Sequence, residues 1–342
     1  MSKQTLEQEL LKDFLMLERY NPKTMAYVQN NLELAVKNII DFISNTQNKA
    51  KIRAFIKKEI GVAFSDLDTL LLEDIDNVTD ATWNKTALTM SHFLSKELVD
   101  KIPKAMPKRV KEKLLNPNRD LMGNNINDFK SSFIYNNNNK LRQTIFNGFE
   151  KNLSTPQIAR ELKHIIASTH RNQLKTVVKT SLFSAINEAK DEMFNDIFDG
   201  DDSIVWRYTS ALDTRTSPYC MTANGYTTKN KSKAKYKPNS HYNCRSMWTM
   251  DSDLVKTQKV VQWDGKTVNH RDGTHSTKYK VASVKRIDKN STPKQVFDSF
   301  DEKYQIKYMG KRRFELYKQG RLKYSDMMDI QRNKFIPLKD LL

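Results

Sequence analysis

Two short segments of the chain hold residue types that could bind a metal ion or carry out acid–base chemistry. The first runs from Leu212 to Cys220, and the second runs from Pro238 to Ser246. Both cysteines of the chain and one of its six histidines lie in these segments. In or just after them, the candidate site residues are Asp213, Arg215, Thr216, Cys220, Gly225, His241, Cys244 and Arg245. Three interpretations of these residues are open.

The first interpretation is a metal site. Cys220, His241 and Cys244 are ligand types that Zn²⁺ prefers, and His-x-x-Cys forms a local pair. Asp213 or a water molecule would supply the fourth ligand. Structural zinc sites normally have four Cys or His ligands, and this stretch offers three.

The second interpretation is a catalytic site, and the third is a structural cluster. In a catalytic site, Arg215 would clamp a phosphate or ribosyl group beside Asp213, and His241 would act as acid or base. No second acid–base group or carboxylate cluster supports this. In a structural cluster, Asp213 would fix a turn by accepting hydrogen bonds from Arg215 or backbone N–H groups. His241 and the two cysteines would then pack in a small core, a common role for buried free cysteine, and this interpretation is favoured.

Short strands are expected around these segments. Ile204–Thr209 is rich in β-branched and aromatic residues, as strands are. Further short strand candidates surround Trp248, Val260–Trp263 and Tyr279–Val281, separated by Gly265 and Gly273. Residues 203–290 are therefore expected to form a small, β-rich module.

Helices are expected before this module. Apolar residues recur every three or four positions through residues 1–102. Thr155 followed by Pro156 predicts a helix start, with Thr as N-cap and Pro at the first helical position. A single apolar stripe then marks one long amphipathic helix. Its members are Leu174, Val178, Leu182, Ile186, Ala189, Met193 and Ile197.

The predicted fold class is α+β, with a mostly helical N-terminal half, the β-rich module and a helical C-terminal tail. Pro103, Pro107, Pro117 and the run Asn136–Asn139 interrupt the helical pattern, which predicts a connection or extended arm there. The predicted regions are a helical domain at 1–102, a linker or arm at 103–140, a helical segment at 141–202, the β-rich module at 203–290 and the tail at 291–342.

The net charge of +18 is unevenly distributed. Residues 1–100 carry 12 basic and 15 acidic side chains, a net of −3, whereas residues 226–290 carry 15 and 5, a net of +10. Concentrated positive charge indicates a polyanion partner, and double-stranded DNA is the expected one. A solvated lysine-rich loop is an equally good interpretation of residues 229–237 alone. The candidate DNA contacts are Lys229, Lys231, Lys233, Lys235, Lys237, Lys285 and Arg286.

Several classes of protein are excluded by composition. None of the nine glycines lies in a G-x-G-x-x-G or G-x-x-x-x-G-K-[ST] motif, which argues against a dinucleotide or Walker-type phosphate site. Two cysteines cannot form a disulfide framework, and the N-terminus lacks the apolar segment of a signal peptide. No stretch approaches the roughly 20 apolar residues of a membrane span. We therefore expect a soluble protein made in the cytosol, with no membrane partner.

The two candidate segments together read Asp-x-Arg-Thr-Ser-Pro-x-Cys, then Gly, then Pro-x-x-His-x-x-Cys-Arg-Ser. This pattern resembles the signature of the phage Mu F-like minor head proteins, the head-morphogenesis family of tailed phages. The resemblance extends in order over residues 141–342. Other matching stretches are Leu141–Ile145, Ser154–Leu162, Val178–Ser181, Ala185–Ala189, Tyr304–Arg313, Leu316–Leu322 and Pro337–Leu341.

The resemblance implies a minor protein of the phage head, present in few copies, that assembles with the portal and can leave with the DNA. The expected locations are the virion head and, during assembly, the host cytoplasm. The expected partners are the portal, other head proteins and double-stranded DNA bound without sequence specificity. The N-terminal helical region would contact proteins, and the basic C-terminal half would contact DNA.

The chain departs from some members of that family in its cysteines. Those members carry Cys where this chain has Ser217 and Ser246, and the loss of two candidate ligands weakens the zinc hypothesis. We therefore expect no cofactor, with zinc kept as the open alternative. The alternative function is a phage-delivered enzyme that acts on nucleic acid or a host protein through Asp213, Arg215 and His241.

Overall fold

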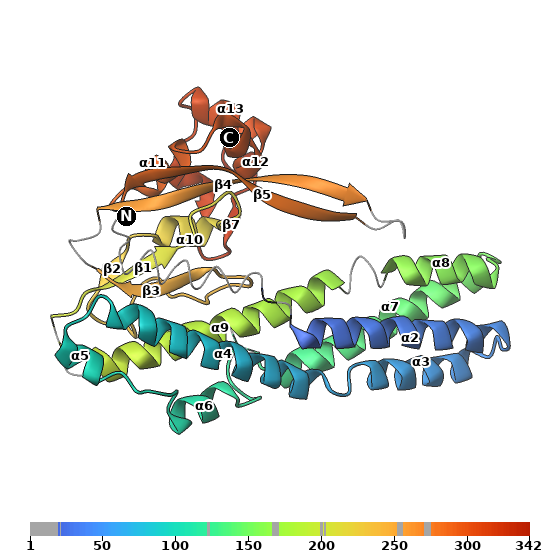
Figure 1. The fold of residues 1–342 in the computed structure, drawn as a ribbon. Coiled ribbons are helices and arrows are strands. Elements are labelled where there is room, and N and C mark those ends of the chain that lie inside the picture. The colour runs from blue at the N-terminus through green and yellow to red at the C-terminus, as the bar shows by residue number, and fades with distance from the viewer. Residues whose placement is uncertain are drawn as a thin grey trace.

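The computed structural model of the protein describes residues 20, 22–121, 124–165, 171–198, 201, 203–251, 256–269 and 275–342. Helices from the first 198 residues form one elongated layer, and the strands and C-terminal helices lie together on one side of it (Figure 1). This arrangement confirms the α+β prediction, with a mostly helical N-terminal half. Among the described helices, none combines the length and apolar character that a membrane crossing requires.

The helical layer buries the apolar periodicity of the sequence. Helices α2 and α3 pack against each other, and α4 packs along α9. Asn48 starts α3 by accepting hydrogen bonds from the Ala50 and Lys51 N–H groups. The helices are α2 (Lys23–Ser44), α3 (Lys49–Ala63), α4 (Leu67–Ser91), α5 (Lys96–Asp100), α6 (Lys108–Leu114), α7 (Ile126–Glu150), α8 (Thr155–Ile165) and α9 (Arg171–Phe198).

The prediction of a connection or arm across 103–140 was wrong for its second part. Helix α7 begins at Ile126, where Asn125 and Asp128 form a reciprocal capping box, and it continues through the asparagine run. Phe133 is buried, and the buried Asn137 side chain donates a hydrogen bond to the Phe133 carbonyl. Packing of this face against α3 thus outweighs the low helix propensity of asparagine.

Helix α9 is the central helix of the molecule. All seven residues of the predicted apolar stripe are buried, which confirms that part of the prediction. Phe183, Ala185 and Phe194 are buried as well, on other faces of the helix. The reason is that α9 packs against α2, α4 and α6, and also against β3. A helix that is enclosed in this way buries more than one stripe.

Two antiparallel sheets follow α9. The first has the order β2-β1-β3, formed by β2 (Thr227–Thr228), β1 (Trp206–Ser210) and β3 (Ser246–Met250). The second is a long hairpin of β4 (Thr257–Asn269) and β5 (His275–Asp288), with a register shift at Gln262/Trp263. Gly265 was expected between strands but lies within β4. An isolated parallel bridge between Asp213 and Val261 connects the hairpin to the first candidate segment.

The C-terminal part packs on the same module. Along the chain, helix α10 (Pro218–Ala223) follows β1 and precedes β2. Three further helices follow the hairpin of β4 and β5: α11 (Pro293–Asp298), α12 (Glu302–Met309) and α13 (Lys311–Lys318). The 3-10 turns η3 (Tyr324–Met327) and η4 (Leu338–Asp340) flank a small hairpin of β6 (Met328–Asp329) and β7 (Lys334–Phe335). These helices share a second hydrophobic core with Leu212, Met221 and Val260, separate from the larger core of the helical layer.

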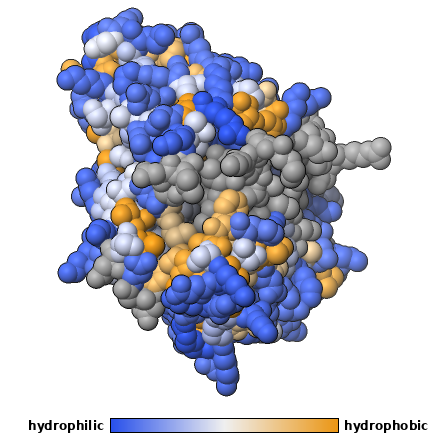
Figure 2. Space-filling model, turned by 60° about the vertical axis from the view of Figure 1, so that its left-hand side comes forward, coloured by the Kyte–Doolittle hydropathy of each residue, from blue (hydrophilic) through white to orange (hydrophobic). Residues whose placement is uncertain are grey.

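The face in Figure 2 is mostly covered by hydrophilic residues, and smaller hydrophobic patches lie between them. The exposed large hydrophobic residues come from elements across the chain, including Leu34 on α2, Tyr135 on α7 and Val284 on β5. Scattered apolar side chains of this kind are ordinary on protein surfaces.

Candidate functional site

The two candidate segments meet beside the three-stranded sheet. Ser217 is the N-cap of α10, where its hydroxyl accepts the Cys220 N–H, and Pro218 occupies the first turn. Strand β3 begins at Ser246, directly after the second segment. Because β1 and β3 pair along their length, from Trp206–Met250 to Ser210–Ser246, the residues after β1 and before β3 meet at one sheet end.

Asp213 lies at the centre of the first cluster. Its carboxylate accepts two hydrogen bonds from the Arg245 guanidinium, both at 2.7 Å. Arg215 donates to the same carboxylate from Nη2 at 2.8 Å and from its backbone N–H at 2.8 Å. The Thr216 hydroxyl accepts the Asp213 N–H and donates to the Ala211 carbonyl. Asp213 is therefore fixed by charge and by backbone contacts at once.

The Asp213 carboxylate is 3% exposed. Burial would raise the pKa of Asp213, but the hydrogen bonds and charge of Arg245, together with those of Arg215, hold this pKa below its usual range. A carboxylate that is ionised and saturated by two guanidinium groups is poorly placed to accept a proton from a substrate. This geometry favours a structural role, as the sequence suggested. Arg215 also lies over the Trp263 ring of β4, at 5.1 Å.

Cys220, His241 and Cys244 form the second cluster. The Cys220 Sγ lies 2.9 Å from the His241 Nε2 and 3.7 Å from the Cys244 Sγ. Both cysteines are free and buried. The Ser217 Oγ also lies 3.0 Å from the His241 Nε2. Arg215, His241 and Arg245 border one cavity of about 140 Å³, so the two clusters are neighbours.

The two thiols and His241 shift one another's pKa values. Burial would raise the pKa of Cys220, but hydrogen bonds from Cys244 and His241 lower this pKa well below its usual value. The pKa of Cys244 is raised by its hydrogen bond to Cys220 and by burial. Burial lowers the pKa of His241, yet the hydrogen bond and charge of Cys220 outweigh it and raise this pKa. The cluster thus stabilises negative charge on Cys220, next to a basic imidazole.

Helix α9 holds the second segment in place. The Asn187 side chain donates to the Asn239 side chain at 2.9 Å and to the Ser246 carbonyl at 2.8 Å. About two helical turns earlier, the Thr180 hydroxyl accepts the Asn243 N–H at 3.0 Å. Asn239 and Asn243 both have positive φ angles, a conformation that asparagine tolerates better than most residues. The α9 face and the turn therefore form one unit.

Gly225 has a structural reason to be glycine. Its φ is +85°, and a Cβ at this position would lie 3.1 Å from the Nη2 of Arg207. Arg207 is buried, and it donates to the Lys289 carbonyl and to Asp251. Gly225 thus leaves room for an arginine that ties β1 to the end of the long hairpin.

The candidate DNA contacts fall into two groups. Lys229, Lys233, Lys235 and Lys237 are exposed on the segment after β2, and Arg286 is exposed on β5. The other two have partners inside the molecule. The Lys285 ammonium lies 2.6 Å from the Asp301 carboxylate. Lys231 donates to Asp191 and Asn195 of α9, and it lies 4.0 Å from the centre of the Trp206 ring.

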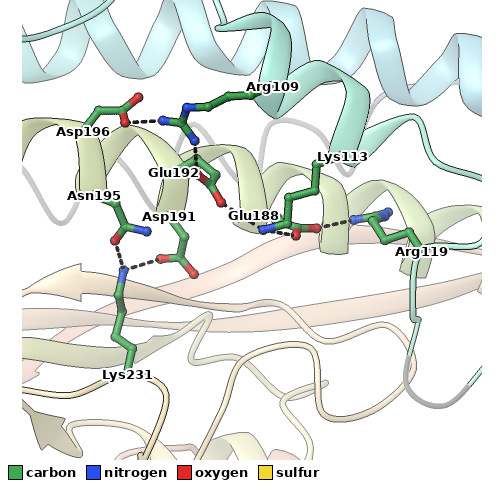
Figure 3. A network of polar contacts seen from close by, with 9 residues as sticks. All are labelled: Arg109, Lys113, Arg119, Glu188, Asp191, Glu192, Asn195, Asp196 and Lys231. Carbon is green, nitrogen blue, oxygen red and sulfur yellow. Dashed lines mark hydrogen bonds and ion pairs between the residues drawn. The ribbon is translucent and has the colours of Figure 1, made fainter.

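The contacts of Lys231 belong to a larger charge network along α9 (Figure 3). On the other side of the helix, α6 and the segment after it supply Arg109 to Glu192 and Asp196, Lys113 to Glu188 and Glu192, and Arg119 to Glu188. Burial raises the pKa of Asp191, although the charge and hydrogen bond of Lys231 oppose it. The network attaches both α6 and the lysine segment to α9.

Sequence reasoning did not identify the partners of the clusters. The Tyr208 hydroxyl is 3.4 Å from the Cys220 Sγ, and the Asn239 N–H donates to the Cys244 Sγ at 3.3 Å. Asn333, from the turn between β6 and β7, accepts the Tyr219 N–H. Tyr208 and Asn333 come from β1 and the tail, far from the cysteines in local spacing, whereas Asn239 lies five residues before Cys244 in the same turn. The acidic residues 188, 191, 192 and 196 do recur at helical spacing, which could have indicated the network.

Comparison with known families gives one match. Residues 139–249 match the family described as Phage Mu protein F like protein. No curated protein and no solved structure matches the chain. The matched range begins inside α7, includes α8 and α9 and ends in β3, so it contains both clusters and the helix that holds the turn. Residues 139–249 of this chain are therefore similar to the Phage Mu protein F like family, as the resemblance of the sequence predicted.

Proposed function

We propose that the chain is a minor structural protein of a tailed-phage head, which acts in capsid assembly with the portal and contacts packaged or ejected DNA. The match to the Phage Mu protein F like family carries this proposal, because that family indicates phage head morphogenesis. The geometry supports a structural role for the matched region. Asp213 is saturated by Arg215 and Arg245, and it is buried away from any substrate.

The first half of the helical layer, residues 1–100, is proposed as the part that contacts the portal and other head proteins. Residues 1–100 carry a net charge of −3, in contrast to the basic remainder of the chain. Such a surface is unsuited to DNA, because the phosphate backbone attracts positive charge.

The portal contact can be tested by co-expression of the full chain with the portal protein of the same phage. Copurification of the two proteins is expected, and it should survive a nuclease treatment that removes any DNA bridge. Failure of the two proteins to associate in solution and in assembling heads would remove the portal from the proposal.

The lysine segment, residues 229–237, is proposed as the DNA contact. Lys229, Lys233, Lys235 and Lys237 are exposed, whereas Lys231 anchors the segment to Asp191. The four exposed cations lie within nine residues of one another, so they concentrate positive charge on one short segment. Lysine contacts with phosphates carry no sequence information, which suits a protein that meets a genome of any sequence.

Duplex binding measured at several salt concentrations tests the DNA contact. The unaltered chain is expected to bind random-sequence duplex at low salt, with an affinity that falls steeply as salt rises. Changing Lys229, Lys233, Lys235 and Lys237 to Gln should reduce the slope of log affinity against log salt by about one for each lost phosphate contact.

A matched control changes four exposed lysines of the helical layer to Gln: Lys37, Lys51, Lys57 and Lys58. This variant has the same net charge as the first, so its binding separates a local contact from the effect of total charge. For the control, the slope of log affinity against log salt should be nearly the same as for the unaltered chain. Equal losses in both variants, or negligible binding by the unaltered chain at low salt, would contradict the proposed contact.

A further inference from the structure

The side chains of Cys220, His241 and Cys244 converge from two directions. Cys220 lies in α10, and the other two lie in the turn before β3. Their three ligand atoms all lie within 4.8 Å of one another. The two sulfur atoms are 3.7 Å apart. Tetrahedral Zn²⁺ with Zn–S bonds of about 2.3 Å holds two sulfur ligands about 3.8 Å apart, so the cysteines are already at the spacing of zinc ligands.

The histidine is oriented as metal-binding histidines are. Its Nδ1 lies 2.9 Å from the Tyr242 carbonyl oxygen. Because a carbonyl can only accept, Nδ1 carries a proton, and Nε2 is the nitrogen that would offer its lone pair to a metal ion on losing its own proton. Nε2 is the nitrogen that faces the Cys220 sulfur, at 2.9 Å. A backbone carbonyl on the remote nitrogen is a common way to fix the tautomer of a zinc-bound histidine.

The Cys244 sulfur accepts a backbone hydrogen bond, and the Cys220 sulfur has a hydroxyl group beside it. The Asn239 N–H points to the Cys244 Sγ at 3.3 Å, and the Tyr208 hydroxyl lies 3.4 Å from the Cys220 Sγ. Asn239 has a positive φ of 60°, which is part of the turn that directs this N–H to the sulfur. Buried negative charge is costly unless donors surround it. The site thus provides donors for two thiolates, the form in which cysteine binds a metal.

A fourth ligand has room beside these three. The cavity of about 140 Å³ is bordered by Ser217, Cys220 and His241. This volume could hold a few water molecules, each of which takes about 30 Å³ in the liquid. The Ser217 hydroxyl lies 3.0 Å from the His241 Nε2, so it is in reach of a water at the fourth position.

We propose that Cys220, His241 and Cys244 bind one Zn²⁺ ion, with a water molecule beside Ser217 as the fourth ligand. Two thiolates and an imidazole form a soft ligand set that suits zinc. The ion ties α10 to the turn before β3, and thereby closes the stretch of chain that contains the lysine segment. This proposal stands on the ligand geometry and does not depend on the phage-head function.

The first experiment measures the metal content of the full chain, purified without chelators and then dialysed against a limited excess of zinc. About one zinc per chain is expected by elemental mass spectrometry. Replacement by Co²⁺ should give the absorption of thiolate-to-cobalt charge transfer and of tetrahedral coordination. Cys220→Ser and Cys244→Ser should each lose most of the metal. Zinc well below one per chain in the unaltered protein would overturn the proposal.

A second variant keeps the test decisive if the cysteine variants fold poorly. Ser217→Cys places a third thiolate next to the His241 Nε2, so it should bind zinc at least tenfold more tightly in competition with a chelator. Its cobalt spectrum should show stronger charge transfer. The control is Ser232→Cys, in the exposed lysine segment, which adds a thiol away from the cluster. Equal zinc affinity in both variants would show that the ion is not bound at this position.

A third experiment tests for a disulfide by titrating the free thiols of the denatured protein. Two reactive thiols are expected after the zinc is removed. A Cys220–Cys244 disulfide in protein made in a reducing cytosol would overturn the proposal, because a disulfide sulfur has no thiolate to offer the metal.

Discussion

At the scale of single residues, Asp213 shows how burial decides the role of a polar group. A carboxylate that is 3% exposed needs compensation for its lost hydration, and Arg215 and Arg245 supply it. The arginines depend on Asp213 in turn, since Arg245 is itself nearly buried. The same pairing that stabilises the turn makes it sensitive to the loss of either partner.

Replacement of this carboxylate should therefore destabilise the protein. Asp213→Asn keeps the shape of the side chain but leaves two guanidinium groups without their counter-charge. We expect a loss of about 3 kcal/mol in the free energy of unfolding, measured by urea denaturation. Asp326→Asn, at an exposed position in η3, is the control and should leave the urea midpoint unchanged. Equal stability of both variants would contradict the structural role of Asp213.

The same carboxylate predicts a pH dependence. The pKa of Asp213 is lowered in the folded protein, so its contribution to stability is present above the unfolded pKa of about 3.9. That contribution is lost as the pH falls below this value, through the folded pKa. Urea midpoints measured between pH 7 and pH 3 should therefore fall more steeply at the acidic end for the unaltered chain than for Asp213→Asn. Parallel curves would contradict the lowered pKa.

Some contacts of Asp213 can be predicted from the sequence, because their partners are close to it along the chain. Arg215 stands two residues from Asp213, and a hydrogen bond between them was expected and is present. The bidentate partner is Arg245, which only the β1–β3 pairing brings near. Tyr208 reaches the Cys220 Sγ because α10 packs against β1, whereas Asn239 lies five residues before Cys244 in the same turn. Contacts that depend on sheet register are not encoded in local spacing.

At the scale of elements, α9 supports the matched region, because its side chains hold the turn before β3 in place. Thr180 and Asn187 lie seven positions apart, about two helical turns, so they present their side chains to the same turn. The sequence predicted the helix well, because its stripe is long and regular. It could not show that the polar residues between the apolar positions bind a distant turn.

Removal of the Asn187 side chain tests this contact. Asn187→Ala leaves the Ser246 carbonyl without its buried donor, which should cost about 1–3 kcal/mol of stability. Trypsin should also cleave faster within residues 229–237, because the turn that follows them is released. Gln173→Ala, at an exposed position of the same helix, is the control for stability. Unchanged stability and an unchanged cleavage rate in Asn187→Ala would refute the idea that α9 holds the turn before β3 in place.

The packing of α7 on α8 gives a second test at this scale. A Cβ on Gly148 would lie 2.6 Å from Cγ1 of the fully buried Ile158, so Gly148→Ala should destabilise the protein by about 1–3 kcal/mol. Gly61 in α3 has no atom within 4 Å of such a Cβ. Gly61→Ala should therefore stabilise the protein by about 0.5–1 kcal/mol. Thermal unfolding of the pair measures both signs, and a gain in stability for Gly148→Ala would contradict the packing.

The arm predicted across 103–140 was wrong from Ile126 onward. Proline and asparagine punctuate that stretch, and the asparagine run has low helix propensity. Helix α7 forms there because Asn125 and Asp128 cap its start and because Phe129 and Phe133 are buried. Burial is a property of the neighbours as much as of the segment, so a local pattern underestimates it.

At the scale of the whole molecule, the matched region joins two hydrophobic cores. Cys220 and Cys244 belong to the core of the helical layer, whereas Leu212 and Met221 belong to the core of the C-terminal helices. The signature segments thus hold the two parts together. The charge varies along the chain as well, since residues 1–100 carry a net of −3 and residues 226–290 a net of +10. This contrast agrees with the proposal that the first part contacts proteins and the basic segment contacts DNA.

The proposed role is that of a structural component of the phage head. Quantitative mass spectrometry of purified virions of the phage that encodes the chain is the most direct test. Treatment of the particles with protease and nuclease before the measurement removes material that is bound outside. A few copies of the chain are expected in each protected head. Infectious heads that contain none of it would contradict the proposed role.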